Sequence, residues 1–170
     1  MSQSSALRFN FGHLLHSPYG TQRIIELDYP TIRLDPETIL TPLVGSFKAS
    51  RTSRGIYIEG ELQSGTTTEC SRCLDPVNVD LTLEMNDLFY YPPPAPDGEF
   101  GIGDDGFLNL APLVRELREL SIPIQLFCQP DCQGLCIECG QNLNEGTCDC
   151  EPDNIDPRLA ILKTLLKDNN

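Results

Sequence analysis

The stretch VNVDLTLEM, residues 77–85, alternates apolar and polar side chains without a break. Its apolar positions are Val77, Val79, Leu81, Leu83 and Met85. A period of two is typical of a β-strand that buries one face and exposes the other. The pattern therefore predicts a strand in an antiparallel sheet that is covered on one side and open to water on the other.

The residues before this strand carry the same kind of signal. A second strand is predicted around residues 56–62, where Gly60 stands in phase with the apolar positions, and further strands are predicted at 45–49 and within 23–34. Short connections favour antiparallel neighbours. The predicted fold class is α+β: an antiparallel β-meander or a partly closed barrel, a helix, and a C-terminal cysteine-rich zinc-binding segment that ends in a helix.

The chain is predicted to form a single domain over residues 1–170, because this length can bury a core without disulfides. Within it, a β-rich part spans residues 23–90. A mobile loop, rich in proline, glycine and acidic residues, spans 91–106. Residues 107–170 then hold a helix, the cysteine cluster and a C-terminal helix.

Two helices are predicted in this last part. Residues 111–120 place leucine and valine at helical spacing, with Pro112 in the first turn, and we expect the apolar stripe to face the core. Residues 121–127 are predicted to form a short strand. The second helix begins with Asp156 as its N-cap and Pro157 in the first helical position.

The chain is acidic, with a formal net charge of −13. Zinc would not offset this charge, because eight thiolates carry more negative charge than two Zn²⁺ ions cancel. Contacts to phosphate need a surplus of Lys and Arg, so general binding to RNA or DNA is disfavoured. A basic protein is the favoured kind of partner, and an acidity that serves only solubility is the alternative.

No apolar run approaches the roughly 20 residues that cross a bilayer, so no membrane partner is expected. Residues 1–20 lack the pattern of a secretory signal. We therefore expect a cytoplasmic protein, or one of the plastid stroma if the chain comes from a plant. In a reducing compartment, clustered cysteines are metal ligands more often than disulfides.

Eight cysteines carry the strongest chemical signal in the chain. They stand in four close pairs, which are Cys70 and Cys73, Cys128 and Cys132, Cys136 and Cys139, and Cys148 and Cys150. Paired thiolates at such spacings suit a tetrahedral Zn²⁺ ion. All eight are therefore candidate metal ligands, and we expect two structural four-cysteine zinc sites.

Eight thiolates can be divided between two sites in two ways. The first joins the pair at 136–139 with the pair at 148–150, and the pair at 70–73 with the pair at 128–132. The rival joins the two Cys-x2-Cys turns and leaves the other four cysteines together. The first arrangement closes one site within a short segment, which costs little loop entropy, so it is favoured.

Three other kinds of cysteine chemistry stay open. An iron–sulfur cluster also uses four thiolates, although the spacings match none of the common ferredoxin patterns. A thioredoxin-like redox pair needs a βαβ setting and a helix N-terminus, and neither is indicated. A catalytic zinc keeps an open position and usually a histidine or carboxylate ligand, so closed structural sites are favoured.

Four motifs in the chain resemble the YceD family of large ribosomal RNA subunit accumulation proteins. They are CSRCL at 70–74, DCQGLCIECGQNLN at 131–144, CDC at 148–150 and DPRLAIL at 156–162. The resemblance extends over about residues 40–166, and the motif at 131–144 is its most specific part. It implies that all eight cysteines are ligands.

The resemblance also implies a non-enzymatic role in the accumulation of 23S rRNA and in assembly of the large ribosomal subunit. Together with the acidity, this predicts an adaptor for a basic ribosomal protein or assembly factor, with rRNA contacted indirectly. One alternative is a direct RNA-binding zinc module that uses Arg51, Arg54 and Arg72 as a local patch. Another is a metal-dependent or thiol redox enzyme.

Overall fold

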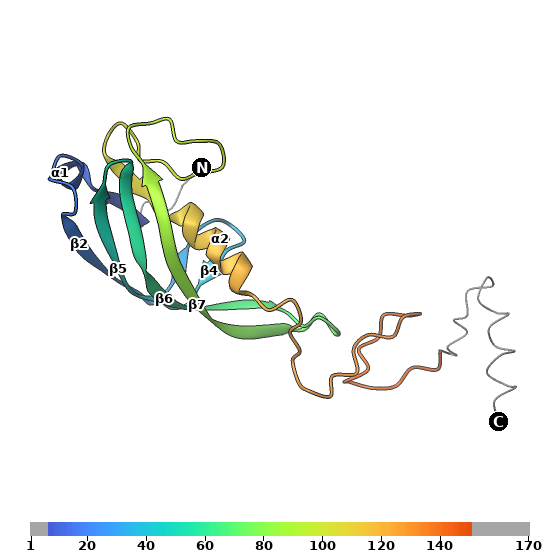
Figure 1. Cartoon of the computed structure of the whole chain (residues 1–170). Coiled ribbons are helices and arrows are strands. Elements are labelled where there is room, and N and C mark those ends of the chain that lie inside the picture. Colours follow the sequence, from blue (N-terminus) through green and yellow to red (C-terminus); the bar gives the residue numbers. More distant parts are fainter. Residues whose placement is uncertain (1–6, 151–170) are drawn as a thin grey trace, which may run out of the picture.

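The computed structural model describes residues 7–150 and is built around a four-stranded antiparallel sheet (Figure 1). Its strands are β2 (Gln22–Tyr29), β5 (Leu43–Thr52), β6 (Gly55–Glu69) and β7 (Pro76–Tyr90). Their order in the sheet is β2-β5-β6-β7. Each of the four strands predicted from the sequence is present, and the meander is confirmed.

Short elements pack on one face of this sheet. They are β1 (Arg8–Asn10) paired with β8 (Phe107–Asn109), β3 (Ile32–Arg33) paired with β4 (Ile39–Leu40), and the helices α1 (Gly12–Leu15) and α2 (Ala111–Ser121). Helix α2 crosses the sheet beside β7 (Figure 1). The fold is thus mostly antiparallel sheet with few helices in the described part of the chain.

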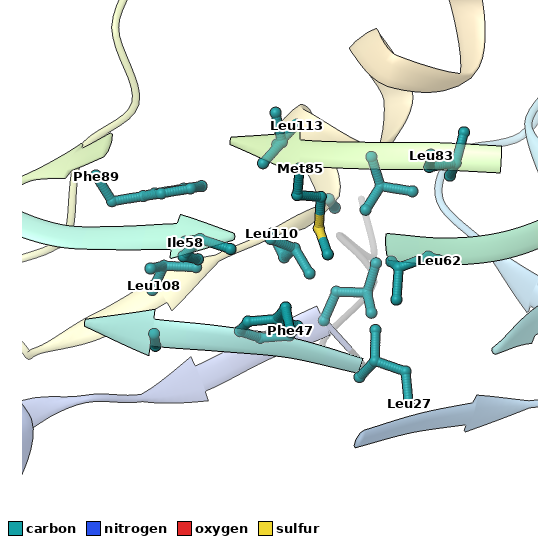
Figure 2. Packing of buried hydrophobic residues seen from close by; sticks show 14 of the residues in the cluster. Leu27, Phe47, Ile58, Leu62, Leu83, Met85, Phe89, Leu108, Leu110 and Leu113 are labelled. Atoms are coloured by element: carbon teal, nitrogen blue, oxygen red, sulfur yellow. The ribbon is translucent and has the colours of Figure 1, made fainter. Parts of the chain in front are cut away.

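The apolar side of β7 faces the core, as its alternation predicts. Leu81, Leu83 and Met85 are buried, and the polar residues between them are exposed. Figure 2 shows Leu83 and Met85 in one buried cluster with Leu113 of α2 and Phe47 of β5. Burial of these apolar side chains supplies the main driving force for folding.

The prediction of a partly closed barrel is wrong. β2 and β7 are the two edges of the sheet and do not pair with each other. A sheet can bury its apolar face either by closing on itself or by packing against other elements. Here α2 and the β1–β8 pair cover that face, with Leu108 and Leu113 buried against it, so closure is unnecessary.

Helix α2 matches the prediction at its start and departs from it at its end. Pro112 lies in the first turn, and Leu113 and Val114 are buried. Leu120, in contrast, is 75% exposed, and the strand predicted at 121–127 is wrong. The chain after α2 leaves the sheet and lies against the cysteine turn beyond β6, so these residues have no neighbouring strand to pair with (Figure 1).

The loop at 91–106 is attached to the core at its second half. The Phe100 ring stacks on Phe89 with 5.2 Å between centroids, the Tyr90 N–H donates to the Phe100 carbonyl, and Ile102 is buried. The mobility predicted for this loop stays a prediction, as does the single-domain organisation. The helix predicted from Asp156 lies outside the described residues.

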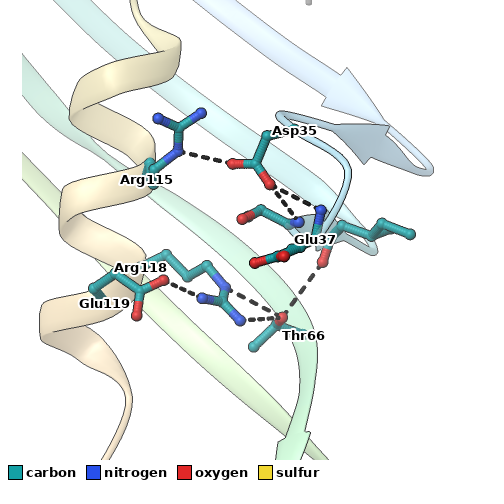
Figure 3. Close-up of polar contacts among 8 residues, drawn as sticks. Asp35, Glu37, Thr66, Arg115, Arg118 and Glu119 are labelled. Carbon is teal, nitrogen blue, oxygen red and sulfur yellow. Dashed lines mark hydrogen bonds and ion pairs between the residues drawn. The ribbon is translucent and has the colours of Figure 1, made fainter.

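A polar contact ties the β3–β4 connection to helix α2 (Figure 3). Asp35 Oδ2 lies 2.8 Å from Arg115 Nε, and Asp35 Oδ1 accepts the N–H groups of Glu37 and Thr38. Partial burial acts to raise the pKa of Asp35. The hydrogen bonds from Thr38 and Glu37, together with Arg115, outweigh it and hold this pKa below its usual value.

Replacing Asp35 by asparagine should lower the free energy of unfolding at neutral pH by about 0.5–1 kcal/mol, because the Arg115 ion pair is lost while the Oδ1 acceptor remains. The native pKa of Asp35 lies below that of the unfolded chain. The stabilisation is therefore present above the unfolded pKa and disappears as the pH falls through the native pKa. Urea unfolding across this pH range would test it, and a difference independent of pH would contradict it.

Candidate metal centre

The first cysteine pair lies in the tight turn between β6 and β7. The Cys70 N–H donates to the Asp75 carbonyl at 2.8 Å, and the Leu74 N–H donates to the Cys70 carbonyl at 3.1 Å. Leu74 adopts a positive φ of 63°, which an L residue takes only when the surrounding bonds require it. The turn thus presents Cys70 and Cys73 from the end of the long β6–β7 hairpin.

The inner cluster consists of Cys70, Cys73, Cys128 and Cys132, whose sulfur atoms all lie within 4.8 Å of one another. The Cys70 and Cys132 sulfurs are 3.8 Å apart, and those of Cys73 and Cys128 are 3.5 Å apart. A zinc ion with bonds of about 2.3 Å to four sulfurs in a tetrahedron separates them by about 3.8 Å. The sulfur positions therefore fit one tetrahedral ion.

Backbone N–H groups converge on the sulfur of Cys70. Arg72 and Cys128 each donate to it at 3.4 Å, and its side chain is fully buried. Burial acts to raise its pKa, but backbone hydrogen bonds from Cys73, Arg72 and Cys128 lower the pKa of Cys70 to about 6. Burial raises the pKa of Cys73. Since metal binding requires thiolates, this set needs a cation to hold all four sulfurs ionised.

The outer cluster consists of Cys136, Cys139, Cys148 and Cys150, again with all sulfurs within 4.8 Å. Gly140 has a φ of +74°, and its N–H donates to the Cys136 carbonyl, which closes the Cys136–Cys139 turn. Backbone hydrogen bonds from Cys139 and Glu138 lower the pKa of Cys136 to about 6. The side-chain hydrogen bond with Cys139 raises the pKa of Cys150 to about 12.

These two groups are the first of the two arrangements considered from the sequence, which loop closure favours. The rival arrangement, with both Cys-x2-Cys turns on one ion, is not the one in the structure. Each cluster offers four sulfur atoms and includes no histidine or carboxylate. The described part of the chain thus contains two four-cysteine clusters that can hold metal ions, while the role of each cysteine as a ligand stays a prediction.

A small second core surrounds the inner cluster. Cys70, Cys73 and Cys132 are buried together, with Val77, Phe127 and Leu135 packed against them. This core is separate from the main one, as it lies at the far end of the β6–β7 hairpin (Figure 1). Closing the inner cluster therefore attaches the segment after α2 to the sheet.

Three residues near the inner cluster have roles that the spacing of the cysteines did not reveal. The Arg72 guanidinium lies 4.5 Å from the centre of the Phe127 ring and donates to the Cys132 carbonyl at 2.8 Å. Asn144 donates to the Cys132 sulfur, and Asn142 donates to Asp75. The sequence offered one indication of these roles: Arg72 stands within the motif CSRCL, and the two asparagines stand in GQNLN, directly after a cysteine pair.

The family model for the large ribosomal RNA subunit accumulation protein YceD matches residues 58–166, a range that includes all eight cysteines. The chain belongs to the YceD family. The similarity that the cysteine motifs indicated is therefore confirmed, and the matched range begins inside β6.

Relatives of this YceD-family chain come from bacteria and plants. An uncharacterized protein of Mycobacterium tuberculosis is 33% identical over 128 residues, which cover 70% of this chain and 59% of the relative. The uncharacterized protein YlbN of Bacillus subtilis is 28% identical over 72% of this chain and 71% of its own length. The maize protein named large ribosomal RNA subunit accumulation protein YCED homolog 1, chloroplastic, is 28% identical over 66% of this chain and 33% of its own.

The match thus spans about three-fifths of the length of the mycobacterial relatives. No solved structure matches the chain. Among the described residues, no helix is long and apolar enough to cross a membrane.

Proposed function

We propose that this chain is a non-enzymatic factor that supports the accumulation of 23S rRNA and assembly of the large ribosomal subunit. It acts as an acidic adaptor that binds a basic ribosomal protein or assembly factor and so contacts rRNA indirectly. The description of the YceD family and the names of the plant relatives support the link to large-subunit rRNA. The surface of the sheet supports the adaptor mechanism.

The observation that carries this proposal is a row of carboxylates across the uncovered face of the sheet. The register places Glu26 of β2 opposite Ser46 of β5, Ser46 opposite Glu61 of β6, and Glu61 opposite Glu84 of β7. All four residues are exposed. The row thus spans all four strands and contains no basic residue.

Two of these carboxylates stand directly opposite each other, which is unfavourable within a sheet. Like charges at opposed positions of neighbouring strands destabilise the pairing of Glu61 with Glu84. The Gln63 amide donates to Glu61, but among the described residues no cation forms a salt bridge with this pair. A basic partner would relieve this repulsion, which supports a binding role for the face.

We propose that each cysteine cluster holds one structural Zn²⁺ ion. Four sulfur ligands leave no open position for a substrate or water, which supports a structural role over a metal-dependent or redox enzyme. In this role the ion in the inner cluster would keep the segment after α2 attached to the β6–β7 hairpin, and the ion in the outer cluster would hold residues 136–150 together. The uncovered face of the sheet would remain free for the partner.

Direct RNA binding through Arg51, Arg54 and Arg72 has less support. Arg51 lies near the end of β5 and Arg54 in the turn just before β6, whereas Arg72 lies past the end of β6. The length of β6 therefore separates them by about 45 Å at roughly 3.3 Å per residue. Arg72 is also engaged with Phe127 and Cys132. The three arginines therefore do not form one local patch.

Replacing Glu26, Glu61 and Glu84 together by glutamine should weaken partner binding at least about tenfold, because the charge complementarity is lost. The unfolding free energy should stay level or rise, because the repulsion between Glu61 and Glu84 is removed. The measurement is a pull-down from RNase-treated cell extract with the full chain as bait, with retained proteins identified by mass spectrometry. The adaptor predicts retention of a basic ribosomal protein or assembly factor.

A matched control changes the same number of charges elsewhere. Replacing Asp97, Glu99 and Asp104 by amides alters exposed acids of the 91–106 loop and should leave partner binding intact. Equal loss in both variants would mean that only the net charge matters. A parallel pull-down from extract without RNase tests direct binding: recovery of rRNA fragments without a basic protein, with a steep dependence on salt, would contradict the adaptor mechanism.

A further inference from the structure

We propose that the two cysteine clusters act as one cooperative metal-binding unit, coupled through the side chains of Asn142 and Asn144. This inference rests on the proposed metal sites and does not depend on the adaptor mechanism. It assigns to both asparagines a positioning role at the inner cluster. The evidence for the coupling is of two kinds: the side-chain amides of Asn142 and Asn144 bond to the inner cluster, and both residues follow directly after the Cys136–Cys139 turn of the outer cluster.

The Asn144 amide bonds directly to a sulfur of the inner cluster. Its Nδ2 lies 3.3 Å from the Cys132 sulfur, and its Oδ1 accepts the Gln133 N–H at 2.8 Å. The backbone N–H can only donate, so the amide oxygen must face Gln133 and the NH₂ group must face the sulfur. An N–H donor at the sulfur fixes the position of the Cys132 side chain as a ligand, which is the role that residues supporting metal ligands commonly have.

Asn142 connects the same segment to the Cys70–Cys73 turn. Its Nδ2 donates to Asp75 Oδ2 at 3.0 Å, and its Oδ1 accepts both the N–H and the Nδ2 of Asn144 at 3.0 and 2.9 Å. The carbonyl of Asp75 in turn accepts the Cys70 N–H. The two asparagines thus connect Cys132 with Asp75, the residue whose carbonyl holds the Cys70 N–H.

Both asparagines are carried by the turn of the outer cluster. The Cys136 N–H donates to the Gln141 carbonyl at 2.8 Å, directly before Asn142. The Leu143 N–H donates to the Gly134 carbonyl, also at 2.8 Å, so residues 134–143 form a closed loop around the Cys136–Cys139 pair. The shape of this loop therefore sets where Asn142 and Asn144 lie.

Coupling in both directions follows from this arrangement. A metal ion on Cys136 and Cys139 orders the loop and delivers the two amides to the inner cluster. A metal ion in the inner cluster fixes Cys132 and the Cys70–Cys73 turn, which hold the other ends of the same bonds. Since coupling between two binding sites is reciprocal, each ion raises the affinity for the other.

The test measures the metal affinity of each site in the full chain. The affinity for Zn²⁺ is measured by competition with a chelator, and the binding of Cd²⁺ is measured by the charge-transfer absorption of its bonds to thiolates. Cys139→Ser disables the outer cluster, and we expect the inner site then to bind about tenfold more weakly than in the wild type. Asn144→Ala should retain two ions per chain but weaken the inner site about 10- to 100-fold, the usual effect of losing a residue that supports a ligand.

Asn144→Asp is the sharper variant, because it keeps the size and the acceptor for Gln133 but replaces the amide donor to Cys132 and Asn142 with a charged carboxylate oxygen. It should weaken the inner site at least as much as alanine does, and its circular dichroism should show an intact sheet. Asn86→Ala, on the exposed face of β7, is the matched control and should bind metal as the wild type does.

Unchanged inner-site affinity in Cys139→Ser, or in both Asn144 variants, would overturn the coupling while leaving the two metal sites in place. A wild-type chain that binds no metal would overturn the coupling and the metal sites together. The pull-down with the glutamate variants remains a separate test of the adaptor.

Discussion

A Cys70→Ser variant is expected to bind one metal ion per chain in place of two and to lose more than about 4 kcal/mol of unfolding free energy. Cys70 is fully buried, and its sulfur accepts N–H groups from Arg72 and Cys128 and lies 3.8 Å from the Cys132 sulfur. A serine hydroxyl stays protonated and is a poor zinc ligand. Native mass spectrometry counts the ions, and chemical denaturation measures the stability.

The size of this effect comes from the second core. Without the inner ion, the buried sulfurs and the side chains of Phe127 and Leu135 lose the contacts that attach their segment to β6 and β7. Cys139→Ser is the comparison, because Cys139 is exposed and residues 7–150 place no such core around its cluster. It should also lose one ion, with a smaller loss of stability. Unfolding that a chelator leaves unchanged in the wild type would contradict the expectation.

A Gly60→Ala variant should lose about 2–4 kcal/mol of unfolding free energy through overpacking at the centre of the sheet. Gly60 pairs directly with Phe47 of β5. A methyl group on Gly60 would lie 2.4 Å from the Ser46 carbonyl oxygen and 2.6 Å from the Phe47 Cα, so backbone would have to move. Phe47 is buried under β1, with its ring 5.6 Å from that of Phe9, and cannot move away freely.

The control for this substitution is Gly146→Ala. The nearest neighbour of a methyl group there is the flexible end of Gln141, at 3.5 Å, so the change should be nearly neutral. Thermal and denaturant unfolding of both variants would test the difference. Equal stability of Gly60→Ala and the wild type would mean that the sheet can adjust at this position.

The strands were predictable because their signal is local. The period of two at residues 77–85 indicates which side chains of the strand are buried, and it does so without information from other parts of the chain. Gly60 stood in phase with its apolar neighbours, yet the reason for a glycine there was invisible, because it depends on Phe47 in the neighbouring strand. The periodicity therefore predicts the strand, but the need for glycine at position 60 is explained only by the pairing of β6 with β5.

The predictions that failed were those that depended on distant parts of the chain. Leu120 fits the apolar stripe of α2, but in the last turn of the helix it is Ser121 that contacts β7, through the Thr82 carbonyl, while the Leu120 side chain is exposed. The barrel failed for a similar reason, since α2 and the β1–β8 pair already cover the apolar face. The row formed by Glu26, Glu61 and Glu84 could not be read from the sequence either, because those residues come from three strands.

The amino-acid sequence by itself determined the meander, the eight cysteines and the family, because periodicity and close spacing are properties of neighbours in the chain. It also favoured the correct grouping of the cysteines, since loop closure depends on sequence separation. Only the tertiary structure decided that the sheet stays open, that the carboxylates align across it, and that Asn142 and Asn144 join the two clusters. These features need residues far apart in sequence to meet, and that depends on register and packing.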